Sequence, residues 1–148
     1  MTLETSVEVR QSVPHSPSRV WKVLTDRDLM ARWLMPNDFR LEIGHRFTFR
    51  GPPIPAVGHD GVAHCEVLDF EAERFLAISF SGGDASGLQS TVTWTLRPTP
   101  EGTELTLLHH GFAADDPLQQ LSRKMMSGGW PRVLQKLAEL AADHCASE

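Results

Sequence analysis

The sequence predicts an α+β fold in which a curved antiparallel β-sheet wraps around one long C-terminal helix. Three observations predict it: strand-like alternation over most of residues 3–110, two short helical segments after the first strand, and one long helical pattern over residues 117–144. The apolar face of such a sheet must be buried, and only the last helix is large enough to cover it. Residues 1–148 are predicted to form a single domain, because a chain of this length can bury one sizeable core.

The first strand and the two short helices occupy the N-terminal quarter of the chain. Residues 3–13 alternate between apolar and polar side chains, as in a strand with one solvent-exposed face. Ser16 followed by Pro17 is typical of a helix N-cap with proline in the first turn. Thr25, with Asp28 three residues later, resembles a capping box and predicts the start of a second helix. Helices this short are marginal alone, so we expect them to be held by packing and to close one end of a space between sheet and helix.

The remaining strands follow as a series of alternating runs. Alternation that resumes at Phe39 predicts a hairpin with its turn at Gly44 and His45. The Pro- and Gly-rich residues 51–58 cannot lie inside a sheet and predict a mobile flap beside its edge. Four further strands are expected near residues 62–70, 74–80, 90–97 and 103–110.

The C-terminal segment returns to helical spacing after Pro117, which suits the first turn of a helix. Its broad apolar face consists of Trp130, Val133, Leu134, Leu137, Leu140 and Ala141. Gly128, Gly129 and Pro131 are each unfavourable in a helix interior. We therefore predict a kink or a local break at these residues.

Charge and composition exclude several classes of protein. The chain carries 14 basic and 19 acidic residues, a net charge of −5, which argues against binding to nucleic acid or to an anionic membrane. No apolar run approaches the roughly 18 residues of a membrane span, and no signal peptide is visible at the N-terminus. We therefore expect a cytoplasmic protein. Cys65 and Cys145 form no CxxC pair and are expected to be reduced thiols.

Five segments between about residues 7 and 142 carry a family resemblance: PHSPSRVWKVLTDRDLMARWLMP, DFRLEIGHRFTFRG, VLDFEAERFLAISF, STVTWTLRPTPEGTELTLLHHGF and GGWPRVLQKLAELA. In this order they resemble the activator of heat-shock protein 90 ATPase homologue-like family. That family belongs to the START/SRPBCC superfamily, with the birch-pollen allergen and the polyketide cyclases. The resemblance implies a helix-grip fold with a deep hydrophobic cavity. It does not imply chaperone activity, because the eukaryotic activators resemble this chain only in their C-terminal domain.

The seven histidines do not predict a metal site. His109 and His110 lie in an expected strand, where neighbouring side chains point to opposite faces and cannot bind one ion together. The sequence also contains no HExxH or comparable ligand spacing. We expect neither a metal nor a cofactor.

Strand parity predicts polar side chains on the concave, apolar face of the sheet. His64 and Glu66 face inward if the even-numbered apolar residues Val62, Leu68 and Phe70 do so. The odd-numbered residues offer a competing apolar face: Ala63, Cys65 and Val67.

The same reasoning places His109 inward, together with Leu105 and Leu107. Inward-facing polar groups must be hydrogen-bonded or must face a ligand, since burying them without a partner costs a few kcal/mol. Three interpretations of His64, Glu66 and His109 remain open: a mutually satisfied cluster, a set that orients a ligand, or general acid-base catalysis.

Six aromatic residues are candidates for the cavity wall, although core packing would also explain them: Trp33, Phe47, Phe49, Phe80, Trp94 and Trp130. Trp33 ends the second short helix and Trp130 lies at the expected break of the long one. We expect both to lie near one opening, beside the loop of residues 51–58.

Three functional hypotheses follow from the sequence. The first is binding of a small hydrophobic or amphipathic ligand between the sheet and the C-terminal helix. The second is an enzyme on the same scaffold, of a cyclase, hydrolase or dehydratase type, that uses His64, Glu66 or His109. The third is a stress-related or chaperone-associated interaction module. The expected partner is a small hydrophobic molecule, with neither nucleic acid nor membrane, and the sequence is compatible with a homodimer.

Overall fold

The computed structural model describes residues 5–55, 60–82 and 88–143, which form one six-stranded sheet and three helices. Their bounds in chain order are β1 Ser6–Val13, α1 Pro17–Thr25, α2 Arg27–Trp33, β2 Arg46–Arg50, β3 Val62–Glu71, β4 Phe75–Gly82, β5 Gln89–Thr99, β6 Gly102–His110 and α3 Pro117–Asp143.

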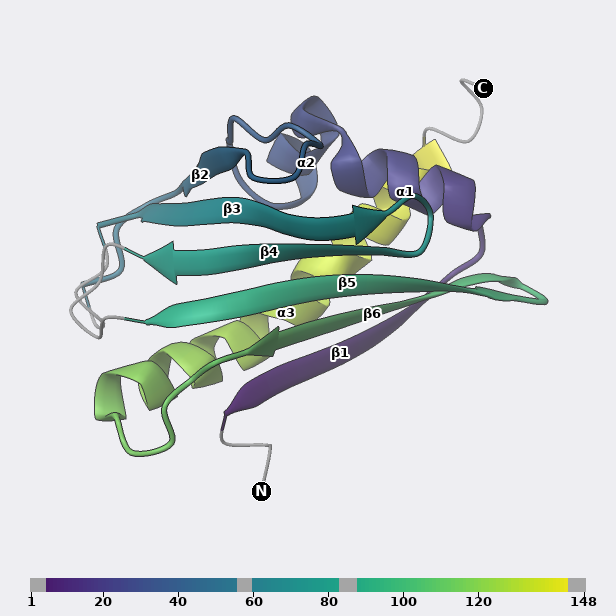
Figure 1. The fold of residues 1–148 in the computed structure, drawn as a ribbon. Helices are drawn as coiled ribbons and strands as arrows, with labels where there is room; N and C mark the ends of the chain where they lie inside the picture. Colours follow the sequence, from purple (N-terminus) through teal and green to yellow (C-terminus); the bar gives the residue numbers. More distant parts are fainter. Residues whose placement is uncertain (1–4, 56–59, 83–87, 144–148) are drawn as a thin grey trace.

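The sheet has the strand order β1-β6-β5-β4-β3-β2, and every neighbouring pair is antiparallel. Figure 1 shows the sheet curving around α3, which crosses one face diagonally. The first and second strands lie at opposite edges, and α1 and α2 connect them while packing against α3. The predicted α+β helix-grip fold is confirmed.

The core lies between the concave face of the sheet and the helices. Three tryptophans form a continuous row across it: the ring of Trp94 on β5 lies 6.2 Å from that of Trp33 on α2 and 6.2 Å from that of Trp130 on α3, edge to face in both cases. The indole N–H of Trp33 donates to the carbonyl oxygen of Val23 at 3.0 Å. Edge-to-face contacts suit the charge distribution of aromatic rings, so this row joins both helical layers to the sheet.

The cap of α1 is the predicted one, and the cap of α2 is not. The Ser16 hydroxyl accepts a hydrogen bond from the Arg19 N–H. At α2 the N-cap is Asp26, whose carboxylate accepts from two backbone N–H groups, whereas the Thr25 hydroxyl donates to the Trp21 carbonyl. An ionised carboxylate at a helix N-terminus is favoured by the helix dipole as well as by these hydrogen bonds.

The predicted hairpin around Gly44 does not form. Residues 38–45 contain no strand, and β2 pairs with β3 instead. Only a single backbone bridge, between Asn37 and Phe49, joins this segment to β2. The Asp38 carboxylate supplies a further link, because it accepts a hydrogen bond from the Thr48 N–H at 2.7 Å. Ile43 is 59% exposed, so the alternation that predicted a strand here does not reflect burial.

The predicted local break in the C-terminal helix is also absent. Helix α3 continues through Gly128, Gly129 and Pro131. Each glycine costs about 1 kcal/mol and a proline about 3 kcal/mol in a helix interior. Burial of Trp130 and Leu134 on the same turns offsets this cost, so packing outweighs local propensity.

Candidate functional site

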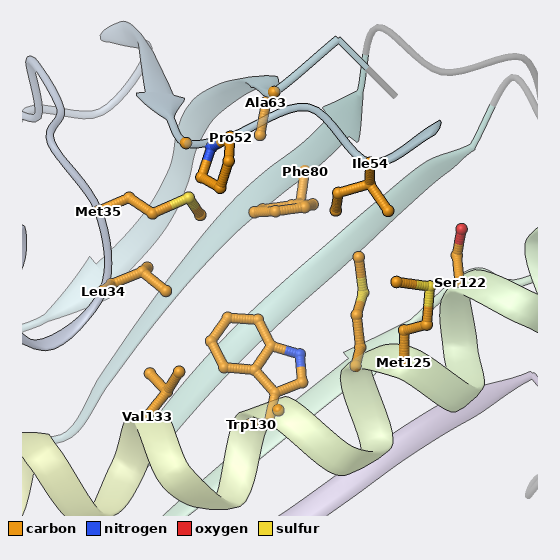
Figure 2. A pocket seen from close by; sticks show the side chains of 14 residues that line it. Leu34, Met35, Pro52, Ile54, Ala63, Phe80, Ser122, Met125, Trp130 and Val133 are labelled. Carbon is orange, nitrogen blue, oxygen red and sulfur yellow. The ribbon is translucent and has the colours of Figure 1, made fainter. Parts of the chain in front are cut away.

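An apolar pocket of about 310 Å³ lies between α3, the segment after α2, the loop that precedes β3, and the strands β3 and β4 (Figure 2). This volume is at the lower end of the range of about 300–1,000 Å³ that is usual for small-molecule sites. The residues of the wall are Leu34, Met35, Gly51, Pro52, Ile54, Gly61, Ala63, Phe80, Ser122, Met125, Met126, Gly129, Trp130 and Val133.

The described wall of the pocket carries no charged side chain and a single hydroxyl, that of Ser122. Three thioether side chains, those of Met35, Met125 and Met126, line the same space as the rings of Phe80 and Trp130. Methionine side chains are unbranched and polarisable, so they adapt to different apolar shapes. The wall therefore suits an apolar molecule and tolerates variation in its outline.

Two glycines hold together the ends of the loop over the pocket. The Gly51 N–H donates to the Gly61 carbonyl oxygen at 2.7 Å. Gly61 has a φ of +91°, and a Cβ there would lie 2.2 Å from the Gly51 oxygen, so only glycine fits. Pro52 and Ile54, from the described part of this loop, line the pocket. Part of the predicted flap, residues 56–59, lies outside the described residues.

Two of the predicted cavity residues, Phe80 and Trp130, line the pocket. Four other predicted aromatics are buried in the core and are not part of the wall: Trp33, Phe47, Phe49 and Trp94. Trp33 and Trp130 do not share an opening. Trp33 is 1% exposed, and the ring of Trp94 lies between it and Trp130.

Sequence reasoning missed most of the wall. On α3 the wall residues recur at positions 122, 125, 126, 129 and 133, which is the spacing of one helix face. This periodicity was a usable signal, since it continues the apolar face of Trp130 toward the N-terminus of the helix. Leu34, Met35 and Ile54 lie in irregular segments, where no periodicity indicates which way a side chain points.

The prediction that His64 and Glu66 face inward is wrong. His64 is exposed and Glu66 half-buried, whereas the competing face of Ala63, Cys65 and Val67 is buried. The cause is an irregularity in the pairing of β3 with β4 between Val67 and Asp69. An extra residue in a strand changes which of the following side chains point inward. Phe70 comes after this irregularity, so its orientation did not indicate that of His64 and Glu66.

His109 does face inward, and it connects two residues of the pocket wall. The Trp130 indole N–H donates to His109 Nδ1 at 3.1 Å. Because Nδ1 accepts, the imidazole proton lies on Nε2 and is donated to the Ser90 hydroxyl at 2.7 Å. That hydroxyl donates in turn to the Phe80 carbonyl oxygen at 2.6 Å. Every polar side-chain atom in this hydrogen-bonded series is satisfied, but the partners of His109 are Trp130 and Ser90 and not His64 or Glu66.

The same arrangement argues against acid-base chemistry by His109. Burial lowers the pKa of His109 to about 3, with a smaller contribution from the positive charge of His110. The rings of Phe80, Phe112 and Trp130 surround the imidazole and leave it inaccessible. Because both ring nitrogens are already used, the side chain positions the wall and has no lone pair free for a substrate proton.

Cys65 lies on the inward face of β3 and is a free thiol. Burial raises its pKa to about 12, and the negative charge of Asp38 adds a smaller increase. Only the thiolate is a nucleophile, so Cys65 should be inert in the folded protein. Cys145 lies outside the described residues.

We expect Cys65 in a Cys145→Ser background to react with Ellman's reagent at pH 8 only as fast as the protein unfolds. Adding urea to the midpoint of unfolding should then accelerate the reaction by orders of magnitude. Rapid labelling of the folded protein would contradict the buried placement.

Within the described ranges, no three His, Cys, Asp or Glu side chains are grouped so that they could hold a metal ion. No helix of the described chain is long and apolar enough to cross a membrane.

The sequence matches the model of the family described as Activator of Hsp90 ATPase homolog 1-like protein over residues 14–142. The chain belongs to this family. The solved structure of protein MLL2253 from Mesorhizobium loti is similar to this chain, with 35% sequence identity and a TM-score of 0.81. The match covers 93% of this chain and 97% of MLL2253. The comparison with curated proteins gave no match.

More distant structures share the fold of this chain. BH1534 from Bacillus halodurans has 22% identity and a TM-score of 0.72, with 92% and 96% of the two chains covered. CalU16 from Micromonospora echinospora has 23% identity and a TM-score of 0.72, with 96% of this chain and 79% of the other covered. At these identities the two structures show a shared fold.

Proposed function

We propose that this protein binds a small apolar molecule in the pocket between α3, β3, β4 and the described residues of the loop before β3. The observation that carries the proposal is the wall itself, which combines an apolar lining, no charged side chain in the described residues and a volume suited to a small ligand. Membership of a superfamily that commonly binds ligands supports it.

The geometry does not favour the enzyme hypothesis. Its three candidate groups do not converge, since His64 and Glu66 lie on the other face of the sheet and both nitrogens of His109 are occupied. An active site requires titratable groups that meet a substrate at one point. We therefore advance binding alone.

Two adjacent glycines on α3 allow a matched test of this proposal. Gly129 lines the pocket, whereas Gly128 is exposed and is not part of the wall. An added Cβ meets no heavy atom within 4 Å at either position. Phenylalanine at 129 should therefore occupy the pocket, and phenylalanine at 128 should extend into solvent.

We expect the neutral fluorescent probe N-phenyl-1-naphthylamine to bind the wild-type protein, and Gly129→Phe to weaken this binding by at least about tenfold. Gly128→Phe should leave the affinity within about twofold, although both substitutions remove a helix-interior glycine. Fluorescence titration gives both affinities, and circular dichroism checks the fold. Equal affinities for the two variants would place the probe elsewhere and contradict the proposal.

A further inference from the structure

The pocket contains one polar group that the protein does not satisfy. Ser122 on α3 is 4% exposed and lines the wall. Within the described part of the chain, its hydroxyl has no hydrogen-bond partner. A helical serine or threonine usually donates to the carbonyl four residues earlier, as Thr25 does to Trp21 at 2.8 Å. The residue as a whole is buried, but its hydroxyl oxygen is not among the fully buried polar atoms and remains accessible from the pocket, so a group bound there can supply the missing hydrogen bond.

Other donors near the pocket are already in use. The indole N–H of Trp130 is bonded to His109, and the Gly51 N–H is bonded to Gly61. Figure 2 shows Ser122 at one end of the pocket, with its hydroxyl pointing away from α3, and Leu34, Met35 and Val133 at the other end. The wall therefore has one hydrogen-bonding end and one apolar end.

The rest of the wall indicates the body of the ligand. A charged ligand would lose its hydration and find no opposite charge in the described wall. Thioether sulfurs make favourable contacts with aromatic rings, and three of them line this pocket. The rings of Phe80 and Trp130 offer edges and faces to a further ring.

We infer that the ligand is an uncharged aromatic molecule that carries a hydrogen-bonding oxygen at one end, and that Ser122 is the residue that recognises this oxygen. The inference rests on the proposed function and adds the chemical class of the ligand. Ser122 then determines the orientation of the ligand in the pocket, while the methionines and rings hold its body.

Three probes of similar size separate these features: 2-naphthol, 2-methylnaphthalene and naphthalene-2-carboxylate. Each is titrated at pH 7 by displacement of N-phenyl-1-naphthylamine from the full-length protein. We expect 2-naphthol to bind about five- to tenfold more tightly than 2-methylnaphthalene, and the carboxylate to bind at least about tenfold more weakly than 2-naphthol.

Ser122→Ala should abolish the preference for 2-naphthol and leave the affinity for 2-methylnaphthalene within about twofold. Ser127→Ala is the matched control, because Ser127 is an exposed serine on the same helix and is not part of the wall. Alanine favours helix at both positions, so neither variant should unfold.

Equal affinities for 2-naphthol and 2-methylnaphthalene, or a preference that survives in Ser122→Ala, would overturn the role of Ser122. Tight binding of the carboxylate would overturn the assignment of an uncharged ligand. In these cases the reporter probe still binds and the proposed function stands. Failure of the reporter itself to bind would overturn the proposed function together with this inference.

Discussion

Replacing Trp33 by alanine is expected to lower the free energy of unfolding by about 3–5 kcal/mol, as for other fully buried aromatic residues. The side chain is 1% exposed, contacts the Trp94 ring edge to face and donates its indole N–H to the Val23 carbonyl. The substitution leaves a large void and an unpaired acceptor at the junction of α1, α2 and β5. Urea unfolding of both proteins measures the loss.

The sequence alone suggested that Trp33 lies at an opening of the cavity, where it would contact the ligand. That position predicts a loss of about 1–3 kcal/mol in ligand binding with little change in stability. Trp33→Phe is the control, because it keeps an aromatic ring and loses only part of the contact area and the hydrogen bond. If Trp33→Ala keeps the wild-type unfolding energy and binds N-phenyl-1-naphthylamine more weakly, the core placement is wrong.

Replacing His109 by glutamine is expected to cost about 1–3 kcal/mol of stability at pH 7, because the chain from Trp130 to the Phe80 carbonyl is broken or distorted. This cost should shrink on acidification. The pKa of His109 is about 3 in the folded protein and 6.5 in its unperturbed state, so between these values the unfolded chain binds a proton that the folded protein excludes. The stability of the wild type therefore falls as pH decreases, by up to about 1.4 kcal/mol per unit, and glutamine lacks this dependence.

Urea unfolding of the wild type and of His109→Gln between pH 7 and pH 4.5 tests the expectation. The difference in unfolding free energy should decrease steadily below about pH 6. His110→Gln is the control, since His110 is exposed at the neighbouring position of β6 and should leave most of the slope unchanged. A difference between wild type and His109→Gln that is constant over this range would show that His109 is not held neutral by burial.

Local patterns were sufficient for most of the elements and for the fold class. The strands β3 to β6, the Ser16 cap of α1 and the inward orientation of His109 all follow from alternation or capping within a few residues. Such signals depend on the nearest neighbours in the chain, which are visible in a single sequence. The fold class follows, because one long amphipathic helix and several strands have few ways to bury their apolar faces.

Long-range packing decided the features that the patterns missed. Alternation from Phe39 to Ile43 resembled a strand, but the Asp38 carboxylate pairs with the backbone of β2 and no neighbouring strand is available there. Helix α3 continues through Pro131, because the residues around it are buried against the sheet. Phe70 misled the prediction for His64, because the irregularity between Val67 and Asp69, which exists only through pairing with β4, separates the two residues.

The sequence by itself determined the family and the α+β class, and the structure contains an apolar space between sheet and helix. Only the tertiary structure decided that Phe80 and Trp130 line this space while Trp33 and Trp94 fill the core, and that Ser122 is its only hydroxyl among the described residues. All four are large aromatic side chains on the apolar face of a helix or strand. Their roles differ because different segments pack opposite them. The arrangement of these segments is set by contacts between residues far apart in the chain.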